Sequence, residues 1–111
     1  QTLTGGSGDD TFAFLQQTDG LDQITDFNTT TQQDRIAISA AGFGGGLTAG
    51  MDVSSTFETT GDDQFSGAAV FHFDAANNTL YYSADGTQAS AVAIVSVQAG
   101  AAINPHDILI V

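Results

Sequence analysis

Short apolar runs and alternation of apolar with polar residues recur along the chain and predict a β-rich protein. Successive side chains of a strand point to opposite faces, so alternation is typical of a half-buried strand. Lys is absent and Glu occurs once, which leaves few strong helix formers. The predicted strands are 11–14, 35–38, 70–73, 79–82, 91–95 and 108–111.

Two turn signals predict that the later strands form an antiparallel meander from about 70 to 95. Residues 75–78 and Asp85-Gly86 separate predicted strands, and Asn and Gly accept the positive φ angles of hairpin turns. The Gly-rich stretch 42–50 predicts a loop, and the polar stretch 54–67 gives no clear prediction. Between 99 and 105 we expect a short helical turn that ends at Asn104-Pro105, because the residue before Pro is steered away from helical geometry.

A nonapeptide near the start carries the strongest chemical signal. Residues 5–13 read Gly-Gly-Ser-Gly-Asp-Asp-Thr-Phe-Ala and fit the calcium repeat G-G-x-G-x-D-x-U-x, in which U is a large apolar residue. The glycines allow a tight turn that exposes carbonyl oxygens, and the Asp supplies a carboxylate. An ordinary Gly-Asp turn without metal is the alternative interpretation.

The nine-residue register continues on both sides of this nonapeptide. Its two columns are Leu3, Phe12 and Leu21, and Gln1, Asp10 and Asp19. One complete repeat therefore has a truncated repeat before it and a degenerate repeat after it. The U residues are expected to point into the core.

The charge balance restricts the possible partners. Thirteen acidic residues face one Arg, giving a net charge of −12, yet the chain is 41% hydrophobic, too apolar for a disordered acidic tail. Nucleic acids and anionic membrane surfaces both require Lys and Arg, so binding to nucleic acid and insertion into membranes are not expected. The carboxylates serve either to bind hard cations or to keep the protein dispersed.

The same composition argues against an enzyme. There is no Cys, no Lys and no H-E-x-x-H motif, and no motif ties either His to a nucleophile. With 111 residues the chain has room for a single domain, 1–111. Because it starts in the middle of the repeat pattern, we expect it to be part of a longer protein.

Further motifs resemble one known family. Residues 22–27 read Asp-Gln-Ile-Thr-Asp-Phe and are followed by Asp34-Arg35-Ile36, which resembles the D-x-I-x-D-F…D-x-I segment after the last repeats of RTX proteins, including serralysin-type proteases. The segments 73–74, 80–82, 85–86 and 107–111 are also similar to the end domain of that family.

The resemblance implies an all-β fold in which short parallel β-roll turns lead into an antiparallel β meander or sandwich cap. Residues 1–27 would be the end of the calcium β-roll, and residues 28–111 the cap, with a C-terminal secretion signal. In such a roll two nonapeptides make one coil, and calcium lies between adjacent loops on the same side.

Carried over residue by residue, the resemblance also implies a set of metal ligands. Gly6 and Gly8 would supply carbonyl oxygens and Asp10 a carboxylate, while Asp22 and Asp26, with Asp19 as a further candidate, would close the last site. Gln1 departs from the family by occupying the Asp column, and only one repeat is complete. About one to three Ca²⁺ ions are therefore expected.

The function implied is a calcium-dependent folding, capping and type I secretion module of a larger extracellular RTX protein. Its partners would be the upstream RTX repeats of the same chain and the type I secretion machinery, and its location extracellular. The alternative is an adhesive or glycan-binding extracellular β domain, in which Tyr81, Tyr82 and the Asn-rich turn present a surface patch.

Two further features are expected to be structural. Gly61-Asp62-Asp63-Gln64-Phe65 repeats part of the nonapeptide but lacks the paired glycines, which indicates an ordinary loop that enters a strand. His72 alternates with Phe71 and Phe73 and is expected on the opposite strand face, solvated or hydrogen-bonded.

Overall fold

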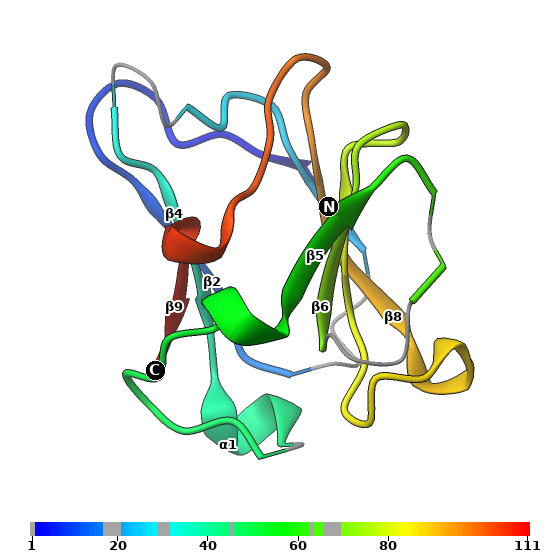
Figure 1. Cartoon of the computed structure of the whole chain (residues 1–111). Helices are drawn as coiled ribbons and strands as arrows, with labels where there is room; N and C mark the ends of the chain where they lie inside the picture. The colour runs from blue at the N-terminus through cyan, green and yellow to red at the C-terminus, as the bar shows by residue number, and fades with distance from the viewer. Residues whose placement is uncertain (1, 17–20, 29–31, 45, 63, 66–69) are drawn as a thin grey trace.

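The strands form two sheets in the computed structural model, which describes residues 2–16, 21–28, 32–44, 46–62, 64–65 and 70–111 (Figure 1). The six-stranded sheet has the order β1 (Thr2–Leu3), β3 (Asp22–Ile24), β8 (Val92–Val97), β7 (Thr79–Tyr82), β6 (Phe71–Asp74) and β5 (Phe57–Thr60). The three-stranded sheet has the order β2 (Thr11–Phe14), β4 (Arg35–Ile38) and β9 (Ile108–Ile110).

Helical segments are short. The α-helix α1 covers Ala40–Phe43, and single 3₁₀ turns cover Ser54–Thr56, Gln88–Ser90 and Pro105–Asp107. Ser39 begins α1 because its hydroxyl accepts a hydrogen bond from Gly42 N at 3.1 Å, which satisfies one free donor of the first turn. In the described part of the chain, no helix is long and apolar enough to cross a membrane.

The β-rich prediction is confirmed, and both predicted turns lie where the sequence placed them, for a clear physical reason. Strands β2, β4 and β7 have the predicted bounds, and β6, β7 and β8 pair antiparallel as expected for a meander. Asn78 has a φ of 54° and Gly86 a φ of 77°, so both hairpin turns use the positive φ that these residue types tolerate.

The local pattern of apolar and polar residues did not predict the elements that depend on partners distant in the chain. Strand β5 lies within the polar stretch 54–67 and pairs in parallel with β6, while α1 overlaps the Gly-rich stretch in which a loop was predicted. The helical turn expected to end at Asn104-Pro105 instead begins at Pro105. Pro suits the first helical position because it lacks an N–H that would have no partner there.

Parallel strands of the two sheets follow one another along the chain. β1, β3 and β8 run parallel in the six-stranded sheet, and β2, β4 and β9 run parallel in the other. The chain thus crosses between the sheets through loop 1 (4–10), loop 2 (25–34) and loop 3 (98–107). These three stacked loops lie together at the upper end of Figure 1, opposite α1.

The nine-residue register predicted for the core does not continue past Phe12. Leu3 pairs with Ile24 rather than with Leu21, and Leu21 is 52% exposed. Ile24, three residues after Leu21, is fully buried and occupies the core position that the register predicted for Leu21. The segment between β2 and β3 is therefore longer than a strict nonapeptide repeat allows.

One apolar cluster joins the two sheets. Phe71 and Phe73 of β6 lie in the same cluster as Ile36 and Ile38 of β4. Tyr82 extends it toward α1, since its ring packs edge-on against Phe43 with centroids 5.4 Å apart. This core fixes the strand ends from which the stacked loops leave.

Candidate cation site in the stacked loops

Asp26 ties loop 2 to loop 1. Its Oδ1 accepts a hydrogen bond from Gly5 N at 3.0 Å, and its Oδ2 accepts one from Gly6 N at 2.7 Å. These backbone donors stabilise the ionised carboxylate and lower the pKa of Asp26 below its ordinary value. The structure thus places this sequence-predicted residue directly against the Gly-Gly turn.

Asp34 makes a second link between the same loops. It is fully buried, and its carboxylate accepts hydrogen bonds from Asp10 N at 2.9 Å and from Asn28 N at 3.0 Å. Asp9 adds a third link, because its Oδ1 accepts a hydrogen bond from Gln33 N at 2.8 Å. Four carboxylates, those of Asp9, Asp10, Asp26 and Asp34, therefore gather where loops 1 and 2 stack.

Sequence reasoning did not name Asp9 or Asp34 as site residues. The sequence does contain a pattern that could have identified Asp34. Asp34-Arg35-Ile36 has the same order as Asp10-Thr11-Phe12: an acidic residue, then any residue, then an apolar residue. The strands confirm this equivalence, as Phe12 pairs with Ile36. Asp9 lies at a variable position of the nonapeptide and had no such signal.

Gly6 and Gly8 have the backbone geometry expected of the calcium repeat. Their φ angles are 84° and 90°, a region that only Gly adopts without strain. With its amide nitrogen toward loop 1, the Gln32 side chain donates to Gly8 O at 3.0 Å and accepts from Gly8 N at 3.0 Å. Gly8 O is therefore shared with a side chain of loop 2.

Asp10 is the least satisfied member of the cluster. Its carboxyl group folds back over Gly5, where a Cβ atom would lie 2.5 Å from Asp10 Oδ2. That Oδ2 is buried and accepts no hydrogen bond from the described residues. Burial, and then the negative charges of Asp34, Asp26 and Asp9, raise the pKa of Asp10.

Asp22, another predicted ligand, lies apart from this cluster. Asp22 is the first residue of β3, whereas Asp26 follows the end of that strand, so the two acids lie at opposite ends of β3. Asp19 and Gln1 lie outside the described residues. The structure thus groups Asp10 and Asp26 near Gly6 and separates Asp22 from them.

The donor chemistry of the cluster suits a hard cation. Carboxylate and carbonyl oxygens are the ligands that Ca²⁺ prefers. Within the described ranges, no three His, Asp or Glu side chains form a group that could hold a metal ion. In Asp26 and in Asp34, both carboxylate oxygens already accept hydrogen bonds from backbone N–H groups. An ion here would therefore use Asp10 together with backbone carbonyls of the glycine turn.

Positive charge is scarce around these carboxylates. Arg35, the one basic residue besides the two His, donates to His106 O at 3.1 Å and to Gln33 Oε1 at 3.3 Å. Both acceptors are uncharged, so these bonds leave the acidic cluster unneutralised.

No family model, curated protein or solved structure matches the chain. The geometry of the stacked loops therefore carries the functional argument.

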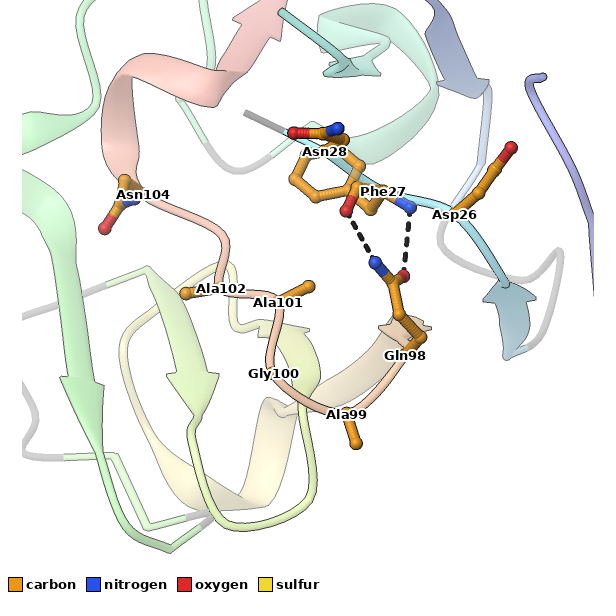
Figure 2. Close-up of a pocket in the computed structure, with 9 residues that line it drawn as sticks. All are labelled: Asp26, Phe27, Asn28, Gln98, Ala99, Gly100, Ala101, Ala102 and Asn104. Carbon is orange, nitrogen blue, oxygen red and sulfur yellow. Dashed lines mark hydrogen bonds between the residues drawn. The ribbon is translucent and has the colours of Figure 1, made fainter. Parts of the chain in front are cut away.

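A cavity of about 660 Å³ lies between loops 2 and 3 (Figure 2). The Gln98 side chain lines it and joins the two loops by accepting from Phe27 N at 2.9 Å and donating to Phe27 O at 2.6 Å. The small residues 99–102, three Ala and one Gly, also line it. Figure 2 shows the Asp26 side chain directed away from Gln98, which agrees with its bonds to loop 1. The acidic chemistry thus lies between loops 1 and 2.

The surface patch considered for glycan binding loses one of its two aromatic residues. Tyr82 is fully buried, and its hydroxyl donates to Gly44 O at 3.0 Å. Tyr81 is half-buried on the other face of β7. A sugar-stacking platform made of both rings is therefore absent from this hairpin.

Proposed function

We propose that the chain is a calcium-dependent folding and capping module of a larger secreted protein of the RTX type, with a role in type I secretion. The strand order supports this proposal: β1 to β4, with β8 and β9, follow the alternating two-sheet path of a parallel β-roll. The glycine turn of loop 1 has the positive φ angles that the nonapeptide motif requires.

The single observation that carries the proposal is the environment of Asp10. A buried carboxylate oxygen without a hydrogen-bond donor, surrounded by three further carboxylates, is unfavourable in the ionised state. A divalent cation bound to Asp10 would remove both the missing interaction and the repulsion. Proton binding would also remove the charge of Asp10.

Calcium would then stabilise the fold by linkage. Extracellular calcium modules have dissociation constants on the order of 10⁻⁴ to 10⁻³ M. With free calcium about a hundredfold above that constant, one site adds roughly 2.7 kcal/mol to the free energy of unfolding. In the calcium-poor cytoplasm the carboxylates repel, which favours the unfolded chain that export requires.

The two ends of the parallel strand arrangement differ in a way that suits a cap. Among the described residues, β1 and β2 are edge strands, so upstream repeats of the same chain could pair with them. At the other end Gly50 N donates to Ile110 O at 2.7 Å and covers β9, while β7 pairs antiparallel with β8. Growth of parallel coils therefore has one open end and one closed end, as at the terminus of a solenoid.

Calorimetric titration with calcium, followed by circular dichroism, tests the proposal. We expect binding in the micromolar to millimolar range, coupled to a gain of β structure and a higher melting temperature. Asp10→Asn should do two opposite things: weaken calcium binding, and stabilise the chelator-treated chain at neutral pH. The second effect follows because the raised pKa of Asp10 means that its ionisation destabilises the folded, calcium-free state.

Asp52→Asn is the matched control. It removes the same charge from an exposed loop residue whose Oδ1 accepts a hydrogen bond from Ser54 N at 2.9 Å, an interaction that Asn can keep. Asp52→Asn should leave calcium binding unchanged. A chain that is fully folded in chelator and indifferent to calcium, or an Asp10→Asn variant that binds calcium normally, would refute the proposal.

A further inference from the structure

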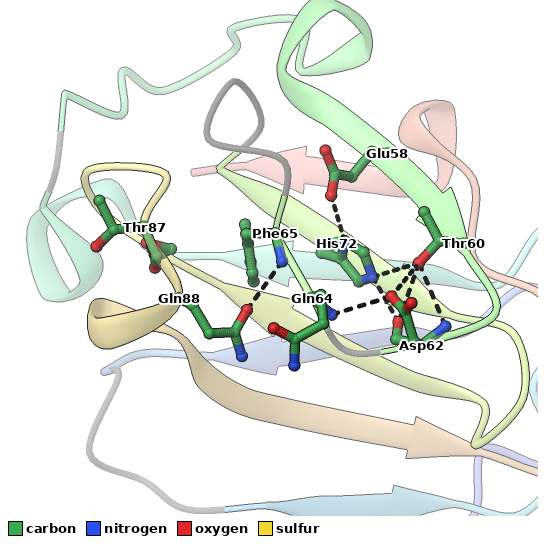
Figure 3. Close-up of polar contacts among 9 residues, drawn as sticks. Glu58, Thr60, Asp62, Gln64, Phe65, His72, Thr87 and Gln88 are labelled. Carbon is green, nitrogen blue, oxygen red and sulfur yellow. Dashed lines mark hydrogen bonds and ion pairs between the residues drawn. The ribbon is translucent and has the colours of Figure 1, made fainter.

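His72 is buried on the face of β6 opposite the core. Its neighbours Phe71 and Phe73 point into the apolar cluster, so the alternation of the strand turns His72 outward. The side chain nevertheless has no solvent exposure. Glu58, its register partner on β5, places Oε2 2.5 Å from His72 Nδ1 (Figure 3). His72 is thus hydrogen-bonded rather than solvated.

The second ring nitrogen also faces oxygen atoms. His72 Nε2 lies 2.7 Å from the carbonyl oxygen of Asp62 and 2.9 Å from Thr60 Oγ1. A carbonyl oxygen can only accept hydrogen bonds, and so can the Glu58 carboxylate. The contacts of both nitrogens are therefore those of a doubly protonated ring that donates to Glu58 and to Asp62. The Thr60 hydroxyl is then free to donate to Asp62 Oδ1 at 3.0 Å.

Loss of one proton would break this pattern. If Nδ1 keeps its hydrogen for Glu58, the Nε2 lone pair faces the carbonyl oxygen of Asp62, and the two repel. Among the described residues of this network, Thr60 supplies the hydroxyl donor, which must turn from Asp62 to Nε2. Deprotonation at Nε2 therefore costs Asp62 two hydrogen bonds at once, one from His72 and one from Thr60. Deprotonation at Nδ1 would instead set the ring lone pair against the Glu58 carboxylate, which is also repulsive.

A turn next to Asp62 covers the outer face of β6. We call its described residues, Gly61, Asp62, Gln64 and Phe65, the covering turn. Gln64 N donates to Asp62 Oδ1 at 3.1 Å, and the Phe65 ring packs on His72 with centroids 5.1 Å apart. Phe65 N donates to Gln88 Oε1 at 2.8 Å, which ties the end of the turn to the segment before β8 (Figure 3).

The titratable groups around the ring come from four segments. Glu58 on β5 and Asp62 in the covering turn face it directly, Asp74 lies two residues along β6 on the same strand face, and Tyr81 is opposite on β7. The Asp74 carboxylate accepts from Ala76 N at 3.0 Å and serves the hairpin turn. All three carboxylates attract a positive ring, and no Lys or Arg is among these neighbours.

We propose that His72 is a proton-controlled latch that holds the covering turn against the outer face of the six-stranded sheet. The closed turn contains the protonated ring, so closing binds a proton and rising pH opens it. Opening would lift Phe65 and expose the polar face of β6. The latch lies outside the stacked loops and does not depend on calcium binding there.

Hydrogen exchange and NMR of the whole chain at one fixed calcium concentration test the latch. Protection factors, which correct for intrinsic exchange, are compared for Gln64 and Phe65 between about pH 5.5 and about pH 8.5, the range of imidazole titration. We expect both protection factors to fall by about tenfold, in step with the His72 ring signals. The side chain of His106 is 80% exposed, and its ring signals serve as an internal comparison.

Matched variants separate the latch from general effects of pH. His72→Gln and Glu58→Gln should each abolish the pH dependence of Gln64 and Phe65 protection, whereas His106→Gln should retain it. Circular dichroism confirms that each variant is folded. The proposal fails if wild-type protection is the same at both pH values, if it follows the His106 ring signals, or if the pH dependence survives in His72→Gln.

Discussion

At the residue scale, individual carboxylates differ through the donors around them. Asp26 faces two backbone N–H groups and has a lowered pKa, while Asp10 in the same loop stack has a raised one. The composition shows only a surplus of Asp, typical of both a cation site and a soluble surface. The hydrogen-bond partners decide which carboxylates are already satisfied.

Asp85 illustrates the satisfied type. Its Oδ1 accepts from Thr87 N at 3.0 Å and from Thr87 Oγ1 at 2.7 Å, and its Oδ2 accepts from Ser90 Oγ at 3.2 Å. Bonds from Thr87, with help from Ser83 and Ser90, lower its pKa to about 2. The stabilisation is present above the ordinary pKa of Asp and is lost as pH falls through about 2.

We therefore expect Asp85→Ala to lower the melting temperature by a few degrees at neutral pH and to have little effect near pH 2, where wild-type Asp85 is itself being protonated. Thermal unfolding followed by circular dichroism across this range measures the effect. A deficit that is the same size at both pH values would show that the carboxylate charge is not what stabilises the turn.

At the element scale, close approach between segments explains the helix that the pattern missed. α1 begins at Ala40 within an apolar, Gly-containing stretch, and Gly42 lies against the end of β2. A Cβ atom on Gly42 would overlap the carbonyl oxygen of Leu15, which is backbone and cannot rotate away. Gly42 is therefore required by packing, since helix propensity alone would favour Ala.

Gly42→Ala should destabilise the chain by about 1–3 kcal/mol, as overpacking does. Gly61→Ala is the matched control, because a Cβ atom there has open space and the φ of Gly61 is not among the positive ones. Urea unfolding gives both values. Equal stability of the two variants would mean that α1 shifts away from Leu15 without cost.

At the scale of the whole molecule, one core supports both sheets and so holds the stacked loops in register. Leu80 of β7 is fully buried and belongs to the cluster that includes β4 residues of the other sheet. Parallel pairing across long separations, such as β3 with β8, depends on this shared core because no local turn joins those strands.

Leu80→Ala should lower the free energy of unfolding by about 2–5 kcal/mol, the cost of a cavity in a closed core. The same substitution at Leu109, which is 41% exposed, should change it by less than about 0.5 kcal/mol. Urea unfolding at fixed calcium compares the two. Similar losses would indicate that the Leu109 side chain is covered in solution.

The sequence by itself determined the features that depend on neighbouring residues: the β-rich class, strands β2, β4 and β7, both hairpin turns and the glycine geometry of loop 1. These follow from side-chain alternation and from backbone sterics, which act over a few residues. Calcium binding, export and the RTX relationship remain predictions that the sequence motivates.

Only the tertiary structure decided the features that depend on residues far apart in the chain. It paired Leu3 with Ile24 in place of Leu21, brought Asp34 to Asp10, separated Asp22 from Asp26, and buried His72 beneath the covering turn. Each outcome depends on loop lengths and on which strands become neighbours. A local pattern cannot contain that information, because the energy of these contacts exists only once the shared core has formed.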